Sequence, residues 1–130
     1  MTGPGRLTLA VLPDSFAVCR LPPGDVLPGW IDWAATFVSV TRSADELSVV
    51  CPAGQVPPDV RHEPGWRALK VAGPLELAMT GVMADLSTAL AEAGVALFAV
   101  SSYDTDYLLV READLPAARA ALAERHRVQG

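Results

Sequence analysis

The chain has 130 residues, of which 51% are hydrophobic and 19% are charged, and its formal net charge at neutral pH is -5. This length suits one compact domain or two small modules and excludes a large multidomain enzyme. The apolar fraction argues for a buried core and against disorder. An acidic chain without a cluster of Lys and Arg argues against binding to nucleic acid.

The sequence also argues against a place in or on a membrane. No apolar run reaches the roughly 18 residues that a spanning helix needs, and no signal-peptide pattern or lipidation motif is present. We therefore expect a cytoplasmic protein. Cys19 and Cys51 have neither CxxC spacing nor a histidine nearby, so we expect both to be reduced thiols in the core.

The first half of the chain reads as short strands separated by proline and glycine. Residues 7–12 and 16–21 are strand-like and flank Pro13, which predicts a hairpin. Two further strands are expected at residues 37–41 and 47–51. Between these two strands, Ser43 and Glu46 have the spacing of a capping box, which predicts a turn.

A loop rich in proline and glycine, ending at Pro64 and Gly65, is the best internal boundary. It divides the chain into an N-terminal module, residues 1–64, and a C-terminal module, residues 65–130. The second module begins with a predicted strand at residues 66–72, which Gly73 ends.

The clearest helix follows in the second half. Thr80 is placed to cap its N-terminus, and Gly94 stands where a left-handed C-terminal cap is expected. The apolar residues Val82, Leu86 and Leu90 fall at i, i+4 and i+8 on one face.

After this helix come a strand at residues 95–101, a turn at 103–106 and a returning strand at 107–110. Asp114 opens a second helix, and residues 128–129 fit a remnant of a last strand. The order strand, helix, strand, strand, helix, strand is that of the ferredoxin-like (βαββαβ) fold, in which both helices cover one face of the sheet.

At this point the residues resemble the ACT domains, and most closely the branch of the aspartate-kinase regulatory modules and the animal cytosolic arginine sensors. The most specific stretch, Ser101 to Val110, combines with the Thr80-Gly81 start of a helix. All the stretches that carry the resemblance are residues 37–42, 45–51, 73–75, 80–84, 90–95 and 101–110.

The resemblance implies an α+β fold of two tandem ferredoxin-like ACT modules, the first abbreviated, each an antiparallel sheet with helices on one face. It also implies a small-molecule site where modules meet side by side. The arginine sensors have more modules than this chain, so a homodimer would rebuild the missing interface. An acidic residue stands just before the helix-opening glycine in those sensors; Met79-Thr80 stands here, so the resemblance does not extend to arginine specificity.

In that group the amino-acid end of the ligand lies against the start of the helix after the first strand, and the aspartate of the strand-turn segment contacts it. The motif match carries these positions over to a set of ligand-binding residues. They are Thr80, Gly81, Val82, Ser102, Tyr103, Thr105 and Asp106.

These residue types suit the chemistry of a free amino acid. Gly81 lets a ligand approach the backbone, and the N–H groups of the first helical turn favour a carboxylate. Asp106 supplies a negative charge for the ammonium group, while the hydroxyls of Ser102 and Thr105 donate or accept hydrogen bonds as needed.

A purely structural interpretation exists for each position. Thr80 and Gly81 are also what a helix cap needs. Asp104 and Asp106 are also typical turn residues that satisfy the local backbone, and Tyr103 is also a typical cross-strand aromatic. The choice stays open at the level of the sequence.

The favoured function is a regulatory protein that binds an amino acid or a similar small metabolite and acts on an effector protein, with no catalytic residues, cofactor or metal. One alternative is an interaction module that binds no metabolite. The other is a metal-dependent enzyme that uses Asp104 and Asp106 as a pair, with Ser101 or Ser102 as nucleophile. No G-x-S-x-G, HExxH, P-loop or G-x-G-x-x-G motif supports such an enzyme.

Overall fold

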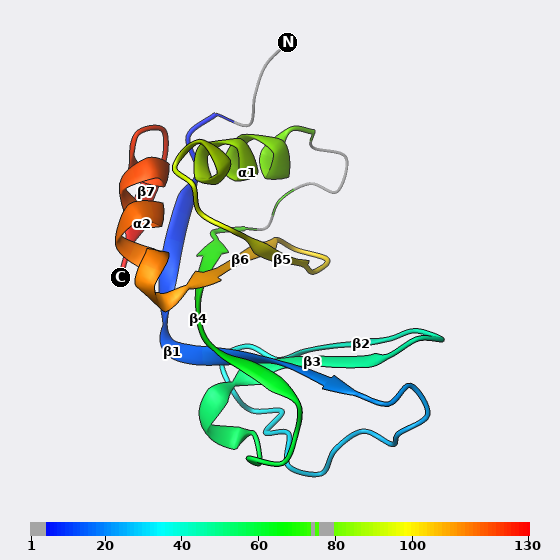
Figure 1. The fold of residues 1–130 in the computed structure, drawn as a ribbon. Coiled ribbons are helices and arrows are strands. Elements are labelled where there is room, and N and C mark those ends of the chain that lie inside the picture. Colours follow the sequence, from blue (N-terminus) through cyan, green and yellow to red (C-terminus); the bar gives the residue numbers. More distant parts are fainter. Residues whose placement is uncertain (1–4, 74, 76–79) are drawn as a thin grey trace. The chain divides into compact units, whose positions relative to one another are not determined.

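The computed structural model describes residues 5–73, 75 and 80–130 of the chain (Figure 1). It divides into two compact units. The C-terminal unit consists of Met1–Pro13 with Arg67–Gly130, and the N-terminal unit is Asp14–Trp66. Residues 5–13, which the division at residue 64 assigns to the first module, therefore lie with the C-terminal unit, and that division stays a prediction.

The C-terminal unit has the predicted order of elements. These are the end of β4 (His62–Val71), α1 (Val82–Glu92), β5 (Phe98–Ser101), β6 (Asp106–Arg111), α2 (Leu115–Ala123) and β7 (Arg127–Gln129). A short 3-10 turn, Glu112–Asp114, leads into α2. The short last strand expected at residues 128–129 is confirmed as part of β7.

One strand joins this unit from the far end of the sequence. The first part of β1 (Thr8–Leu21) lies between β4 and β7, so that the strand order of the unit is β7-β1-β4-β6-β5. β7 runs parallel to β1, with Leu9 opposite Val128, whereas β5 and β6 are antiparallel. Residues 65–130 alone therefore do not complete this sheet.

Helix α1 is positioned by its apolar face and by a glycine at each end. Val82, Leu86 and Leu90 are buried, as their spacing predicts. The prediction that Thr80 caps the helix is wrong: the N-cap residue is Gly81, in a left-handed conformation with φ 83°, and no side chain caps the helix. Gly94 has φ 74°, which confirms the predicted left-handed end.

The core of the C-terminal unit joins both helices to the strands. Leu86 of α1 and Leu122 of α2 pack in one cluster with residues of β1, β4 and β6. A single cluster that contains both helices confirms that they cover the same sheet face. The buried residues of the cluster are Leu7, Leu9, Leu69, Val71, Val82, Leu86, Leu90, Val95, Leu108, Val110, Ala118 and Leu122.

The N-terminal unit contains the second part of β1, the short β2 (Ser39–Arg42) and β3 (Leu47–Pro52). β3 pairs antiparallel with β1 and with β2. A 3-10 turn, Ala53–Gln55, follows β3, and no α-helix occurs in this unit, all of whose residues are described. Over the described residues the fold is thus α+β, with a mainly antiparallel sheet and two α-helices, and a second ferredoxin-like module stays a prediction.

The predicted hairpin around Pro13 is wrong, because β1 is continuous from Thr8 to Leu21. The strand pairs with β7 at residues 8–10 and with β3 at residues 16–21. Pro13 is exposed and lies between these two pairings, where a missing backbone N–H is tolerated. The turn predicted at Ser43 is confirmed: its Oγ accepts hydrogen bonds from the N–H groups of Asp45 (3.2 Å) and Glu46 (3.3 Å).

Within the described residues, no helix is both long and apolar enough to cross a membrane.

Candidate functional site

The turn between β5 and β6, together with the first residue of β6, holds four of the seven predicted ligand-binding residues. Its backbone closes through a hydrogen bond from the Ser102 N–H to the Thr105 carbonyl, at 2.8 Å. The Ser102 Oγ donates to the same carbonyl at 3.1 Å and accepts from the Thr105 N–H at 3.3 Å. The Ser102 hydroxyl is therefore used within the turn.

Thr105 is a structural anchor in this turn. It is only 4% exposed, and its Oγ1 donates a 2.6 Å hydrogen bond to the carbonyl of Val71, the last residue of β4. A buried hydroxyl needs such a partner, since an unsatisfied one costs stability. The bond fixes the turn against the end of β4.

Asp106 starts β6 and faces Ser101, the last residue of β5, across the hairpin. The Ser101 Oγ donates a 2.6 Å hydrogen bond to Oδ1 of Asp106. The carboxylate is half-buried and Ser101 is exposed. This bond engages one carboxylate oxygen and orients the side chain.

The chain that leaves β4 passes close to the same turn. The Leu75 N–H donates to the Asp104 carbonyl at 2.6 Å. A Cβ atom on Gly73 would lie 3.0 Å from that carbonyl oxygen and 3.2 Å from the Cβ of Thr105, so glycine permits the approach. Tyr103, at the tip of the turn, is 79% exposed.

The other three predicted residues lie at the start of α1. Thr80 and Gly81 are exposed, whereas the Val82 side chain is buried in the core. The Gly81 carbonyl accepts the first helical hydrogen bond, from the Asp85 N–H at 2.9 Å. The N–H groups of the first turn have no partners within the helix and point toward its N-terminal end.

The structure thus gathers Ser102, Tyr103, Thr105 and Asp106 in one turn and Thr80, Gly81 and Val82 at one helix start, both in the C-terminal unit. That the two groups form a single ligand site stays a prediction. Pro74 and Met79, which belong to the motifs discussed above, lie outside the described residues.

A cluster around His126 was missed by the reasoning from sequence. His126 is 2% exposed, its Nδ1 lies 3.0 Å from the Leu7 N, and its Nε2 lies 2.6 Å from Oδ2 of Asp85. Arg125 also pairs with Asp85, at 2.8 Å. The signal was weak, because His126 stands in a charged stretch near the end of the chain and its two partners are distant in sequence.

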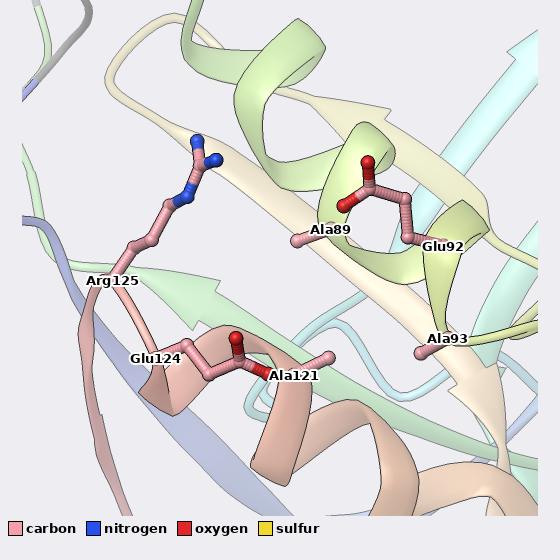
Figure 2. A pocket seen from close by; sticks show the side chains of 6 residues that line it. All are labelled: Ala89, Glu92, Ala93, Ala121, Glu124 and Arg125. Carbon is pink, nitrogen blue, oxygen red and sulfur yellow. The ribbon is translucent and has the colours of Figure 1, made fainter.

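A shallow hollow of about 170 Å³ lies between the last turns of α1 and α2 (Figure 2). It is lined by Ala89, Glu92, Ala93, Ala121, Glu124 and Arg125. Ligand pockets usually measure about 300–1,000 Å³, and none of the predicted ligand-binding residues lines this one. We therefore treat it as a surface groove between the helices.

The two cysteines lie together in the core of the N-terminal unit, both buried and both free thiols. The prediction that they are core thiols is confirmed. A hydrogen bond with Cys51, together with burial, raises the pKa of the Cys19 thiol above its ordinary value. The same hydrogen bond lowers the pKa of the Cys51 thiol below its ordinary value, so the two thiols titrate as a pair.

Among the described residues, no three His, Cys, Asp or Glu side chains are grouped so that they could hold a metal ion. Asp104 and Asp106, the pair of the enzymatic alternative, are engaged differently: the Asp104 backbone holds Leu75, and the Asp106 carboxylate holds Ser101.

Comparison with known proteins follows the same division of the chain. A family model described as ACT domain matches residues 61–124. A second family model, described as an N-terminal domain, matches residues 14–59. Among curated proteins, no sequence matches.

Several solved structures are similar to the whole chain. The crystal structure of a protein from Agobacterium tumefaciens is 39% identical, with a TM-score of 0.88, and covers 95% of this chain and 92% of its own. Aspartate kinase from Clostridium acetobutylicum, an allosteric enzyme, has 15% identity and a TM-score of 0.68, and the match covers 95% of this chain and 35% of the kinase. The ligand-free regulatory subunit of aspartate kinase from Thermus thermophilus has 14% identity and a TM-score of 0.60, and the match covers 89% of this chain and 95% of that subunit.

The match to the family model, the βαββαβ order of the C-terminal unit and the shared fold agree. The chain belongs to the ACT-domain proteins.

Proposed function

We propose that this protein is a regulatory sensor that binds a free amino acid or a similar small metabolite through its ACT domain. The observation that carries the proposal is an uncapped helix start, opened by the left-handed Gly81, in the same unit as a turn that presents the Asp106 carboxylate. Together these features offer donors for a carboxylate and an acceptor for an ammonium group.

In this proposal the first-turn N–H groups of α1 bind the ligand carboxylate, with the positive end of the helix dipole adding to the attraction. Asp106 binds the ammonium group through Oδ2, while Oδ1 holds Ser101. Ser102 and Thr105 contribute by fixing the turn, because their hydroxyls are engaged within the fold. Tyr103 is exposed and free to pack on the ligand side chain.

The finer features of the proposal concern assembly and output. β5 is the last strand in the order of the C-terminal unit, among the described residues, so a second copy has an edge against which to place the ligand site. We therefore propose a homodimer with the ligand at an interface between ACT modules. The protein would act in the cytoplasm on a separate effector protein and would catalyse no reaction.

The regulatory part of the proposal is supported by the neighbours of similar fold, among which is the regulatory subunit of an aspartate kinase. A fold is shared by proteins of different function, so this support is by analogy. The site residues carry the rest of the argument.

Thermal unfolding in the presence of each of the twenty amino acids at about 1 mM tests the proposal. A ligand at 100 times its dissociation constant stabilises the folded state by about 2.7 kcal/mol. We expect a selective rise in Tm that Asp106→Asn abolishes. Asp104→Asn is the matched control, since it removes a charge two residues away and leaves the Ser101 partner intact.

The same screen decides against the proposal in two ways. No shift with any amino acid would remove the amino-acid ligand. A shift that persists in Asp106→Asn would place the ligand elsewhere.

An interaction module without a metabolite is the second candidate, and one observation favours it. Val26, Leu27 and Trp33 are exposed in the segment between β1 and β2 of the N-terminal unit, at 85%, 50% and 60%. Exposed apolar side chains mark protein-binding surfaces where they gather in one patch, and these three lie within a stretch of eight residues. Substituting Trp33 would then abolish binding to the effector while leaving any response to amino acids unchanged.

A further inference from the structure

His126 is the one histidine of the C-terminal unit, and both of its ring nitrogens are engaged. The Leu7 N–H donates to Nδ1, so Nδ1 is unprotonated and the proton of the neutral ring lies on Nε2. Nε2 then donates to Oδ2 of Asp85 at 2.6 Å. The backbone donor thus selects the tautomer that can reach Asp85.

The residues around His126 fasten the two ends of the chain together. The Leu7 N–H is held by the His126 ring, and the Leu7 carbonyl accepts from the Arg127 N–H at 2.8 Å. Parallel pairing of β1 with β7 begins at the next residue, with Thr8 opposite Arg127. His126 itself is held at the end of α2, where its N–H donates to the Leu122 carbonyl at 2.9 Å.

Asp85 connects this closure to the start of α1. It lies in the first turn of the helix, and its own N–H closes the first helical hydrogen bond, to Gly81. Its carboxylate is 16% exposed and holds His126 through one oxygen and Arg125 through the other. The first turn of α1 therefore presents N–H groups without helical partners at the N-terminus of the helix. Through Asp85, the same turn also contacts His126, which binds Leu7.

We propose that His126 is a positioning residue that relays the state of the first turn of α1, through Asp85, to the pairing of β1 with β7. The ligand-dependent part of this proposal rests on the proposed function, because it assumes that the ligand binds at the first turn of α1. A ligand that orders the turn tightens the Asp85 bond to His126, and that bond holds the ring where it accepts from Leu7. By linkage, firm pairing of the chain ends also favours ligand binding.

Backbone hydrogen exchange, followed by NMR on the whole chain, tests the relay without any ligand. In Asp85→Ala the ring loses its acceptor, and we expect the Leu7 amide to exchange about tenfold faster, the factor that corresponds to about one lost hydrogen bond. The amide of Leu108, in the core strand β6, reports global opening and should change less. Asp85→Asn keeps an acceptor oxygen for Nε2, so it should restore Leu7 to nearly the wild-type rate.

Arg125→Ala is the matched control. It removes the other partner of Asp85, an arginine side chain that is 66% exposed, and leaves the His126 bond in place. We expect no change at Leu7. Equal acceleration of Leu7 and Leu108 in Asp85→Ala would show global destabilisation and overturn the relay, as would an unchanged Leu7.

Two substitutions of the ring separate its two bonds, and they also serve if Asp85→Ala does not fold. Asn at this position places an acceptor near the place of Nδ1 but does not reach Asp85, so His126→Asn should leave Leu7 about as poorly protected as Asp85→Ala does. Gln places a donor near the place of Nε2 and lacks the acceptor, so His126→Gln should expose Leu7. Full wild-type protection of Leu7 in His126→Asn would overturn the relay, and full protection in His126→Gln would overturn the assignment of Nδ1 as the acceptor.

The second hydrogen-exchange experiment adds the amino acid that the thermal screen identifies. At saturation we expect it to slow exchange at Leu7 several-fold in the wild type and not in His126→Asn. Binding without any change at Leu7 would overturn the relay and keep the proposed function. Absence of any binding amino acid, together with the predicted Asp85→Ala result, would overturn the proposed function and keep the connection between α1 and the chain ends.

Discussion

The C-terminal and N-terminal units are stabilised by different combinations of interactions. In the C-terminal unit, two amphipathic helices and the strands share one core, and the polar contacts inside it are few and buried, such as Thr105 to Val71 and His126 to Leu7. In the N-terminal unit, two long loops are fastened by side chains that bind backbone groups. Two amphipathic helices therefore explain much of the order of the C-terminal unit, whereas the N-terminal unit combines a smaller core around Cys19 and Val49 with individual side chain to backbone hydrogen bonds in its loops.

The fastening in the N-terminal unit depends largely on arginine. Arg42 donates to the carbonyls of Pro23 and Asp25, the latter at 2.6 Å, and Arg20 donates to the Asp45 carbonyl at 3.1 Å. The Gln55 Oε1 accepts from the Asp32 N–H at 3.0 Å. A planar guanidinium with several donors suits such multiple carbonyl contacts.

The largest effect that separates the two explanations should come from Leu9→Ala. Leu9 is fully buried in the core of the C-terminal unit, although it comes from the beginning of the chain. Truncating a buried leucine costs about 2–5 kcal/mol, so urea unfolding should show a loss in this range. Leu27→Ala, at a half-exposed position of the N-terminal unit, is the control and should change little. A loss for Leu9→Ala as small as the control's would mean that β1 is not part of the C-terminal core.

The next effect should come from Thr105→Val, which keeps the shape of the side chain and removes its buried hydroxyl. The Val71 carbonyl then loses its 2.6 Å partner, at a cost of about 1–3 kcal/mol in unfolding free energy. Thr105→Ser retains the hydroxyl and should recover most of the loss. If Thr105→Val were as stable as the wild type, the anchoring role of the hydroxyl would be refuted.

A smaller effect is expected from Arg42→Met in the N-terminal unit. Arg42 is exposed, so the loss of its carbonyl contacts should cost about 0.5–1.5 kcal/mol. Exchange of the Asp25 amide, which bonds to the Pro22 carbonyl, should accelerate more than exchange in β3. Arg42→Lys keeps the charge without the planar fork and should give an intermediate result. Uniform exchange throughout the unit would argue against local fastening.

The smallest expected effect is a pH dependence of stability that comes from the Cys19 thiol. Its folded-state pKa is raised by the hydrogen bond with Cys51 and by burial, whereas the unfolded thiol ionises near pH 8.5. Above that pH the unfolded Cys19 holds fewer protons than the folded one, which lowers stability as pH rises from about 8 to 10, while the lowered pKa of Cys51 offsets part of this decline. Urea unfolding across this range should show a shallower decline in the double variant Cys19→Ala/Cys51→Ala, because burial alone would raise the pKa of a Cys51 left without its partner. A decline of the same steepness would assign it to other groups.

Local signals predicted the C-terminal unit well. The i, i+4, i+8 spacing of Val82, Leu86 and Leu90 and the position of Gly94 gave α1 to within a residue or two at each end. The error at Thr80 has a local reason, since Gly81 takes the left-handed N-cap position and leaves the threonine outside the helix. The order of strands around α1 followed from the same local patterns.

Long-range partners could not be read from local signals. The place of residues 8–10 beside β7 depends on a pairing between opposite ends of the chain. The Pro13 break looked like a turn because the sequence does not show that β1 changes partners there. His126 and Asp85 are 41 residues apart, so no spacing rule joins them.

The candidate site was predicted as a set of residue types, and the structure refines their roles. The sequence marked Ser102 and Thr105 by their hydroxyls, but only the three-dimensional contacts show that these hydroxyls serve the turn. In the proposed function, Asp106 and the opening of α1 are the groups whose bonding capacity a ligand would use.

Native mass spectrometry of the purified protein with a mixture of all twenty amino acids tests the central claim most directly, because one spectrum reports the ligand mass, its stoichiometry and the oligomeric state. The account predicts a dimer that carries one adduct of a single amino-acid mass per chain. The adduct should be lost in Asp106→Ala and kept in Asp104→Ala. A protein that takes up no amino acid, or an adduct indifferent to Asp106, would contradict the account.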